Sequence, residues 1–262
     1  MAYHCRRRPS FARCPVRRFS LSMGHRLINP SYRLLDYLYT ALHQAHVDGT
    51  PVLHPLWFKY PKDSNTFPID HQFFFGDSIL VSPVTEDDST TVSIYLPKDI
   101  FYDFFSLAPV QGAGSFVTLN NVDFTQIPVH IKGGAVLPLR VKGTMTTTEL
   151  RKQSFELVVA PNANGQATGQ LYVDDGESIK QGRQTNLKFK FAFGSLSITG
   201  SAAYEPGTLD RVRFLGVSKA PKLVTVSGKP VGRSSWSYNS TSKVLDVTVK
   251  AKLAQVSSVA FV

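Results

Sequence analysis

Residues 127–139 read IPVHIKGGAVLPL, two short apolar runs on either side of Gly133-Gly134. Runs of this length that are rich in Val, Ile and Leu are typical of buried strands, and a glycine pair between them is typical of a break in the pattern. The stretch therefore predicts one strand that ends before Gly133 and a second that begins after Gly134. Similar short apolar runs separated by turn residues occur before and after this stretch, so the expected fold class is mainly β.

Short alternating or β-branched runs, separated by Gly, Pro and Asp turns, fill the chain beyond Ile79. Strands at spacings of roughly 8–12 residues with turns between them fit antiparallel sandwiches better than a parallel sheet. A polar stretch, Val141–Thr148, divides the runs into two sets. We expect a proximal β-sandwich at 79–140 and a distal β-sandwich at 141–262. The strands predicted are Ile79–Val84, Val92–Leu96, Phe101–Phe105, Ser115–Leu119, Ile127–Leu139 (broken at the glycine pair), Phe155–Val159, Gln170–Val173, Leu187–Phe193, Ser195–Thr199, Arg211–Leu215, Leu223–Val226, Val244–Val249 and Ser257–Val262.

The segment 31–78 follows a different pattern. Apolar residues recur at helical spacing from Leu34 to Ala45, and Gly49 followed by Pro51 predicts the end of that helix. The apolar run Pro51–Phe58 then predicts a buried strand. Because a helix that leads into a buried strand is typical of α/β folds, this segment is expected to differ from the β-domains.

The net charge of +10 is concentrated at the start of the chain, where residues 1–30 hold seven Arg and no Asp or Glu. We expect a basic tail there that is disordered or spurious. A nucleic-acid-binding arm is the alternative, but no aromatic interleaving, recognition helix or second basic patch accompanies it. No signal peptide is visible, and no stretch approaches the roughly 20 apolar residues that span a bilayer, so we expect neither a nucleic-acid nor a membrane partner.

Several motifs together resemble glycoside hydrolase family 31, and fungal α-glucosidases in particular. YRLLDYLY at 32–39, GTPV at 49–52 and Pro55-Leu56 resemble the late barrel region of that family. LVSPV at 80–84, Lys132-Gly133-Gly134 and LYVDDG at 171–176 resemble its two C-terminal β-domains. Two residues depart from the family pattern: Asp36 stands where many members have Pro, and His54 where many have Arg.

The resemblance implies a mainly β fold: two antiparallel β-sandwich domains preceded by a helix-strand remnant of a (β/α)₈ barrel at 31–78. It also implies a parent enzyme that is a retaining α-glucosidase-type glycoside hydrolase, acts on oligosaccharides at O-glycosidic bonds of non-reducing glucosyl ends and is extracellular. The two catalytic aspartates of the family lie on earlier barrel strands, in motifs that are absent here. We therefore assign no catalytic residue and no cofactor, and expect the chain alone to be inactive.

Other acidic and histidine pairs are expected to have structural roles. Asp87-Asp88 and the group Asp174-Asp175-Gly176-Glu177 lie where turn chemistry favours Asp. The second group lacks the spacing of a calcium loop. His43 and His46 share a predicted helix face, but no further residue completes a zinc set. No metal site is predicted.

The alternative function is a non-catalytic carbohydrate-binding or structural β-sandwich module. Trp236 and Tyr238 are candidates for stacking on sugar rings, although ordinary core or edge packing is the commoner role of such aromatics. Asn239-Ser240-Thr241 is a sequon, so Asn239 is a candidate glycosylation site if the parent enzyme is secreted.

Overall fold

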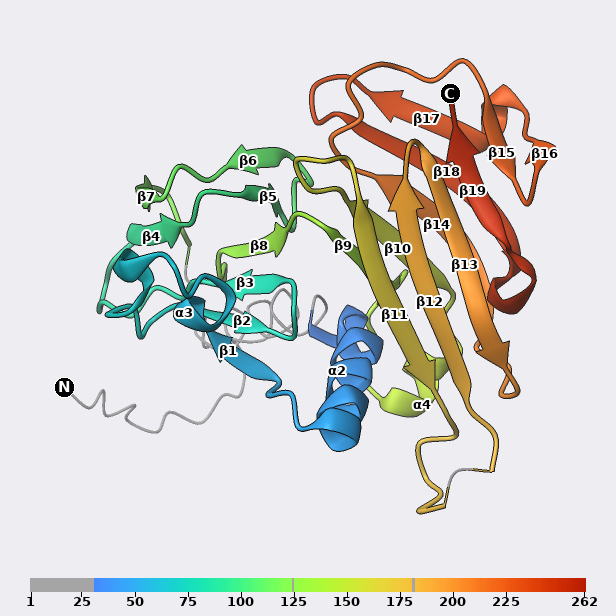
Figure 1. Ribbon diagram of the computed structural model, residues 1–262, viewed down its shortest axis with the longest axis horizontal. Coiled ribbons are helices and arrows are strands. Elements are labelled where there is room, and N and C mark those ends of the chain that lie inside the picture. Colours follow the sequence, from blue (N-terminus) through green and yellow to red (C-terminus); the bar gives the residue numbers. More distant parts are fainter. Residues whose placement is uncertain (1–30, 124, 181) are drawn as a thin grey trace, which may run out of the picture.

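Two large β-sheets, of 11 and six strands, lie beside one long helix, and a third sheet has two strands (Figure 1). The computed structural model describes residues 31–123, 125–180 and 182–262; the basic tail predicted at 1–30 lies outside them. The helix, α2 (Leu35–Asp48), ends where the sequence predicts. Gly49 adopts the left-handed conformation (φ 78°) and donates its N–H to the Ala45 carbonyl, a cap that glycine makes without steric cost. None of the helices in these residues is long and apolar enough to cross a membrane.

The smaller region contains a six-stranded sheet and a two-stranded sheet, and its connections include α3 (Leu56–Lys59) and a 3₁₀ turn, η1 (Ser64–Thr66). The pair is β4 (Val92–Leu96) with β7 (Ser115–Leu119). The order of the six strands is β1 (Leu53–Pro55), β2 (Phe73–Phe75), β3 (Ile79–Val81), β8 (Val129–Lys132), β5 (Ile100–Asp103) and β6 (Pro109–Gln111).

The larger sheet has 11 strands and is antiparallel except where β10 pairs with β14 and β9 with β11. A short helix, α4 (Thr147–Arg151), and two 3₁₀ turns, η2 (Arg233–Ser235) and η3 (Leu253–Gln255), lie in its connections. The order of the strands is β16 (Lys229–Pro230), β15 (Val224–Val226), β19 (Ser258–Phe261), β13 (Ser195–Ala202), β12 (Thr185–Ala192), β11 (Ala167–Val173), β9 (Ala135–Arg140), β10 (Phe155–Ala160), β14 (Thr208–Phe214), β18 (Val244–Lys252) and β17 (Trp236–Asn239).

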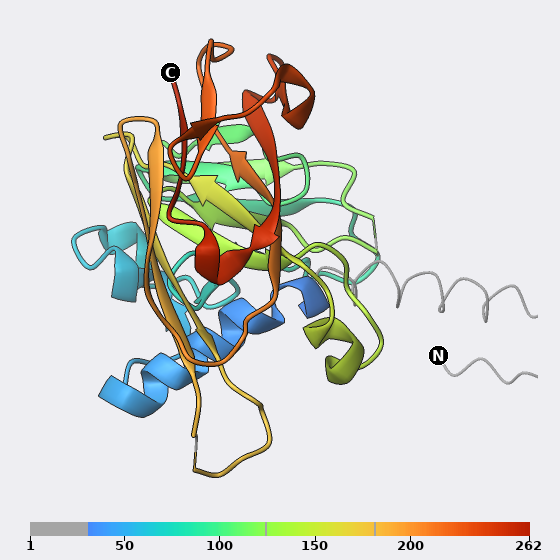
Figure 2. The same ribbon diagram turned by 90° about the vertical axis from the view of Figure 1, so that its right-hand side faces the viewer.

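The large sheet curls into a sandwich, and Figure 2 shows its strands on two sides of an enclosed core. Side chains of β12 such as Phe189 and Phe191 meet those of β10 and β14, including Leu157 and Phe214, across this core. Strand β12 alternates strictly between buried and more exposed residues, as a strand with one face on a core should. The mainly β fold predicted from the sequence is confirmed.

Strands β9 and β10 are buried on both faces, because a second core lies on their other side. All six residues of each strand are buried. Leu137 and Val158 pack there against Ile131 of the small sheet and Leu34, just before α2. The two sheets and the helix therefore share one apolar contact region, which holds them together. A third cluster, with Phe74 and Phe101, fills the small region itself.

Two expectations differ from the structure. The run Pro51–Phe58 is not one buried strand: β1 has three residues, pairs antiparallel with β2, and gives way to α3 after Pro55. Pro55 has no N–H to continue a ladder, and its fixed φ suits the start of a helix. Strand β9, expected in the proximal sandwich, pairs with β10 along its whole length. The chain thus changes sheets at Gly133-Gly134, before the boundary predicted at residue 140.

Candidate functional site

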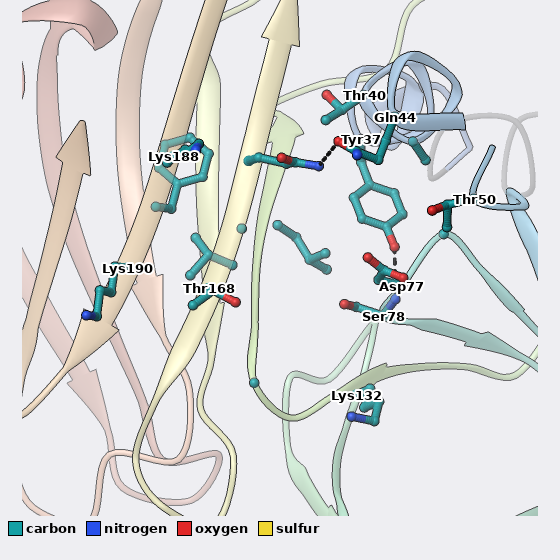
Figure 3. A pocket seen from close by; sticks show the side chains of 18 of the residues that line it. Tyr37, Thr40, Gln44, Thr50, Asp77, Ser78, Lys132, Thr168, Lys188 and Lys190 are labelled. Atoms are coloured by element: carbon teal, nitrogen blue, oxygen red, sulfur yellow. Dashed lines mark hydrogen bonds between the residues drawn. The ribbon is translucent and has the colours of Figure 1, made fainter. Parts of the chain in front are cut away.

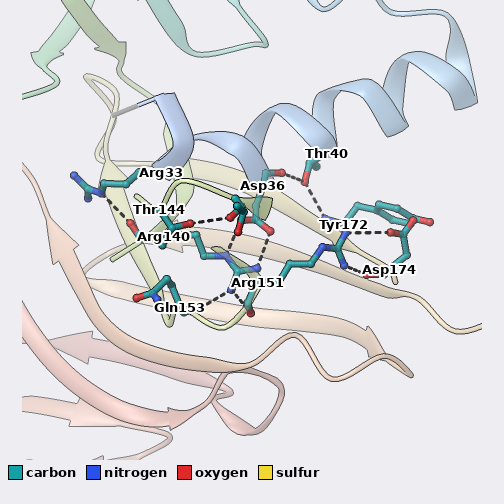
Figure 4. Close-up of polar contacts among 10 residues, drawn as sticks. Arg33, Asp36, Thr40, Arg140, Thr144, Arg151, Gln153, Tyr172 and Asp174 are labelled. Carbon is teal, nitrogen blue, oxygen red and sulfur yellow. Dashed lines mark hydrogen bonds and ion pairs between the residues drawn. The ribbon is translucent and has the colours of Figure 1, made fainter. Parts of the chain in front are cut away.

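The N-terminal turn of α2 is tied to the large sheet by a buried ion pair (Figure 4). Arg140 at the end of β9 donates from Nε and Nη2 to the two carboxylate oxygens of Asp36, at 2.7 and 2.9 Å. The Arg140 side chain is only 2% exposed and that of Asp36 13%. Paired N–H bonds of this kind are among the strongest polar contacts in proteins, because both the charge and the planar geometry match.

The remaining donors and the flat face of Arg140 are also occupied. Nη1 donates to the Gln153 carbonyl at 2.6 Å, and the guanidinium lies 3.8 Å from the centre of the Phe155 ring. A buried charge is tolerated when it is paired and its hydrogen-bonding groups are satisfied. Arg140 therefore joins three elements: α2, the segment before β10, and β10 itself.

A second buried carboxylate, Glu156 of β10, collects arginines beside the first pair. Arg33, just before α2, approaches it at 3.2 Å, Arg213 at 3.4 Å and Arg211 at 3.5 Å, while the Glu156 side chain is 2% exposed. Arg33 also donates to the Arg140 carbonyl at 2.8 Å. Burial is the main cause that lowers the pKa of Arg33. Arginine supplies charge and hydrogen-bond donors but does not accept protons. We therefore assign this cluster a structural role, and call it the clamp, because it holds the start of α2 against β10 and β14.

The middle of α2, from Tyr39 to His43, makes a third set of contacts, with β11 and the residue that follows it. The Tyr172 N–H donates to Thr40 Oγ1 at 3.0 Å, and Thr40 in turn donates to the Asp36 carbonyl at 2.8 Å. The His43 ring stacks on the Tyr172 ring, with centroids 3.6 Å apart. Tyr39 donates to both carboxylate oxygens of Asp174, and burial followed by that contact raises the pKa of Tyr39 to about 12.

A groove of about 670 Å³ is lined by residues of α2, of the small sheet and its turns, and of β11 and β12 (Figure 3). Tyr37 lies at its wall, where its hydroxyl donates to the Phe75 carbonyl and accepts from the Ser78 N–H, both at 3.0 Å. The ring also covers Gly76, which has a φ of 59°, and a Cβ there would collide with the tyrosine. The lining is rich in cations and uncharged polar groups, and it has one carboxylate, that of Asp77.

His54 is a buried polar side chain in this groove. It is 1% exposed, and neither ring nitrogen has a hydrogen-bond partner among the described residues. Its ring stacks on Phe58 at 4.7 Å, and the nearest carboxylate, Asp77, lies 4.0 Å from Nδ1 and is paired with Lys59. Burial first, and the Lys59 charge second, lower the pKa of His54.

The acidic groups singled out in the sequence lie apart and make local contacts. Asp88 is an exposed turn residue with φ 55°. Asp174 is held by Tyr39 and Arg151, and Asp175 accepts from the N–H groups of Glu177 and Ser178. His46 is exposed on α2, while His43 is stacked on Tyr172. In residues 31–123, 125–180 and 182–262, no three His, Cys, Asp or Glu side chains gather as metal ligands would.

Trp236 and Tyr238 lie two residues apart on β17, on the side that packs against the core of the large sheet. The guanidinium of Arg233 covers the Trp236 ring at 3.7 Å, and Tyr238 donates its hydroxyl to the Val217 carbonyl at 2.8 Å. These contacts fit the packing role that is common for such aromatics, and the role of the pair in stacking on sugars stays a hypothesis. Asn239, in contrast, is exposed at the end of β17, where its Oδ1 accepts from the N–H groups of Thr241 and Ser242.

Sequence reasoning did not single out Arg140 or Glu156, although a signal was present. Each is a charged residue inside or beside an apolar strand run: Arg140 follows Leu137-Pro138-Leu139, and Glu156 interrupts Phe155–Val159. Because charged side chains are almost never fully buried unless paired, such a position predicts a partner of opposite charge. It does not predict which one.

Comparison with known proteins agrees with this architecture. Residues 49–137 match the glycosyl hydrolase family 31 C-terminal domain. A probable alpha/beta-glucosidase of Aspergillus clavatus is 43% identical over 88% of this chain and 26% of its own length. The alpha-glucosidase of Schizosaccharomyces pombe is 37% identical over 83% of the chain and 22% of its own length.

Among solved structures, the glucosidase II alpha subunit in its DNJ-bound form matches 98% of the chain and 30% of its own, with a TM-score of 0.79 and 25% identity. The Flavobacterium johnsoniae family 31 dextranase complexed with glucose covers 88% of this chain and 31% of its own, with a TM-score of 0.72 and 25% identity. The chain thus spans between about a fifth and a third of the length of these proteins.

Proposed function

Because this chain belongs to glycosyl hydrolase family 31, we propose that it is the C-terminal part of a retaining α-glucosidase and supports the catalytic barrel of that enzyme. The parent enzyme would hydrolyse O-glycosidic bonds at the non-reducing glucosyl ends of oligosaccharides. A retaining mechanism needs two carboxyl groups about 5–5.5 Å apart, one as nucleophile and one as acid and then base. The chain would contribute neither group, and it would be inactive alone.

The observation that carries this proposal is the uneven burial of α2 and the segment that follows it. One side of the helix is fastened to the large sheet through Asp36, Thr40 and Tyr39. Apolar side chains elsewhere in 31–78 remain exposed, among them Leu42 (55%), Trp57 (47%), Phe58 (44%) and Phe67 (58%). Trp57 and Phe58 lie side by side, with ring centroids 6.2 Å apart, and exposed apolar groups that lie together fit a surface that another structure covers. Barrel elements of the parent enzyme fit that requirement.

In this proposal the chain holds α2 in a fixed position relative to the β-domains. A helix of the barrel that is held at Asp36 by a buried arginine keeps a fixed position, and catalysis depends on holding reacting groups to within about an ångström. The extracellular location of the parent enzyme, suggested by the resemblance to fungal α-glucosidases, belongs to the same proposal. A glycan on Asn239 would follow from secretion, because the asparagine is exposed beside a turn.

A chimera tests the proposal directly. This chain would replace the matching C-terminal part of the Aspergillus clavatus relative, to which it is 43% identical. We expect the chimera to hydrolyse 4-nitrophenyl α-D-glucoside, and the chain alone to give no turnover. A folded chimera without activity, or clear turnover by the chain alone, would contradict the proposal. The same chimera with Lys152→Ala, a change in an exposed ion pair, serves as the control that substitution in this part is tolerated.

A further inference from the structure

Phe193 stands at the tip of the β12–β13 hairpin with its ring in solvent. The residue is 96% exposed, and the hairpin turn lies at the upper end of the large sheet in Figure 1, at the end away from α2. Its φ is 51° and that of Gly194 is 76°. Two positive φ values in a two-residue hairpin are those of a type I′ turn, in which Asn-Gly is the preferred pair.

Phenylalanine is a costly residue at this position for two separate reasons. A left-handed backbone costs a residue with a Cβ about 1–2 kcal/mol, and an exposed aromatic ring gains nothing from burial. Asparagine would remove both costs. Residues with strained backbone conformations are concentrated at functional sites. The positive φ of Phe193 therefore supports the hypothesis that this residue has a function.

The turn that carries Phe193 is rigid. Ala192 and Ser195 pair across the hairpin, and Gly194 accepts the Phe261 N–H at 2.9 Å. A Cβ on Gly194 would lie 2.7 Å from the Phe261 carbonyl oxygen, so the turn sits directly against β19. The turn therefore fixes the backbone position from which the Phe193 ring projects, and an ordered backbone lowers the cost of binding a ligand.

Phe193 borders a groove of about 680 Å³, a size typical of small-molecule sites. The β10–β11 turn lines one part with Asn164, and the loop at 216–222 lines another with Ser218, Lys219 and Lys222. All four of these side chains are exposed. They offer an amide, a hydroxyl and two ammonium groups, and the lining contains no Asp or Glu side chain. An aromatic face beside many donors and acceptors suits a ligand with a C–H face and a rim of hydroxyls.

We infer that this groove binds a gluco-oligosaccharide, with Phe193 as the ring on which a sugar stacks. The α-linked class of ligand rests on the proposed function, since the parent enzyme would act on α-glucosides. This groove does not include Trp236 or Tyr238. The Trp236 ring is covered by Arg233, and the Tyr238 hydroxyl donates to the Val217 carbonyl.

The variant Phe193→Asn tests the inference without threatening the fold, because Asn-Gly suits the turn better than Phe-Gly. Maltotriose is titrated into ¹⁵N-labelled chain up to about 20 mM, a concentration that saturates a site with a Kd of about 1 mM. We expect saturable shifts of the amide signals of Phe193, Asn164 and Ser218. The affinity should fall about tenfold or more in Phe193→Asn, the loss typical of an aromatic anchor. It should stay unchanged in Phe67→Asn, which removes another exposed ring.

The melting temperature of Phe193→Asn should equal or exceed that of the unmodified chain, whereas a lower value would mean that the ring serves the fold and would overturn the inference. Equal affinity of the two forms, or no saturable shift at these amides, would also overturn it. So would a concentration-dependent dimer that Phe193→Asn abolishes, because a second copy would then be the occupant. Failure here is separable from failure of the proposed function: an active chimera without maltotriose binding removes only this site, and binding with an inactive chimera removes only the proposed function.

Discussion

Asp36 and Arg140 lie 104 residues apart in the chain and form a two-bond ion pair that is almost fully buried. Asp36 is one of the two residues that depart from the pattern of the family, where many members have proline. Proline suits the first turn of a helix through its fixed φ. Aspartate serves there in another way, since its charge is favourable at a helix N-terminus and it neutralises the buried guanidinium.

Removing one partner of this pair should be costly. Asp36→Ala leaves the Arg140 charge buried without its carboxylate, so we expect the free energy of unfolding to fall by about 3–5 kcal/mol. Urea unfolding followed by far-UV circular dichroism measures the loss. Lys152→Ala is the control, because it breaks an exposed pair with Glu149 and should cost about 0–1 kcal/mol. The double change Asp36→Leu with Arg140→Met should recover much of the stability, and equal losses in Asp36→Ala and Lys152→Ala would contradict the expectation.

Thr40 tests the second attachment of α2. Thr40→Val keeps the shape of the side chain but leaves the buried Tyr172 N–H without its acceptor, which costs about 1–3 kcal/mol. Hydrogen exchange of the Tyr172 amide should accelerate in step with the lower stability. Thr168→Val on the same strand, at an exposed position, should have little effect. If both variants behave alike, the Thr40 contact does not stabilise the helix.

His54 should make the stability depend on pH. Its pKa is lowered in the folded chain, so the unfolded chain binds the proton more readily. The stability is then complete above the ordinary histidine value of about 6.5 and falls as the pH drops below it. Burial lowers the pKa of His130 and of His43 in the same direction, so part of the slope should survive in a His54 variant.

The measurement is the free energy of unfolding between neutral pH and the mildly acidic range. His54→Leu should reduce the slope by up to about 1.4 kcal/mol per pH unit, the amount for one proton. His71→Leu removes a histidine whose side chain is 69% exposed and is the matched control. A slope that His54→Leu does not alter would show that His54 is not the group that titrates.

Gly169 should not tolerate a side chain. Strand β11 passes so close to β9 that a Cβ on Gly169 would collide with the Val136 carbonyl oxygen. We expect Gly169→Ala to lower the free energy of unfolding by about 1–3 kcal/mol, because the sheet has to shift. Gly232→Ala is the control, since a Cβ there meets only Ser234 Oγ at 3.8 Å. Thermal melting of both variants decides the matter, and an unchanged melting temperature for Gly169→Ala would show that the two strands separate freely.

Local pattern predicted most of the strands and the long helix of this chain. β4 and β7 have the predicted ends, because their residues alternate or branch at Cβ and turn residues bound them. The prediction failed where local preference and pairing disagree: Trp57 and Phe58 are apolar like a buried strand, yet β1 has a partner on one side only and ends at Pro55. Lys229–Pro230 and Pro109–Gln111 are strands only because a neighbour pairs with them.

The family, the mainly β fold, the end of α2 at Gly49 and the break at Gly133-Gly134 follow from the sequence by itself. The last three depend on periodicity and backbone preference within a few residues, whereas the family follows from the resemblance of several motifs taken together. Which charges meet and which rings are covered were decided by the tertiary structure alone. Arg140 could have paired with many acids; it meets Asp36 because α2 packs against β9. Trp236 is covered because β17 packs against the core of the large sheet, and Phe193 is exposed because the β12–β13 turn lies beyond that core. Contacts between distant segments depend on how the layers pack, and no local pattern encodes that packing.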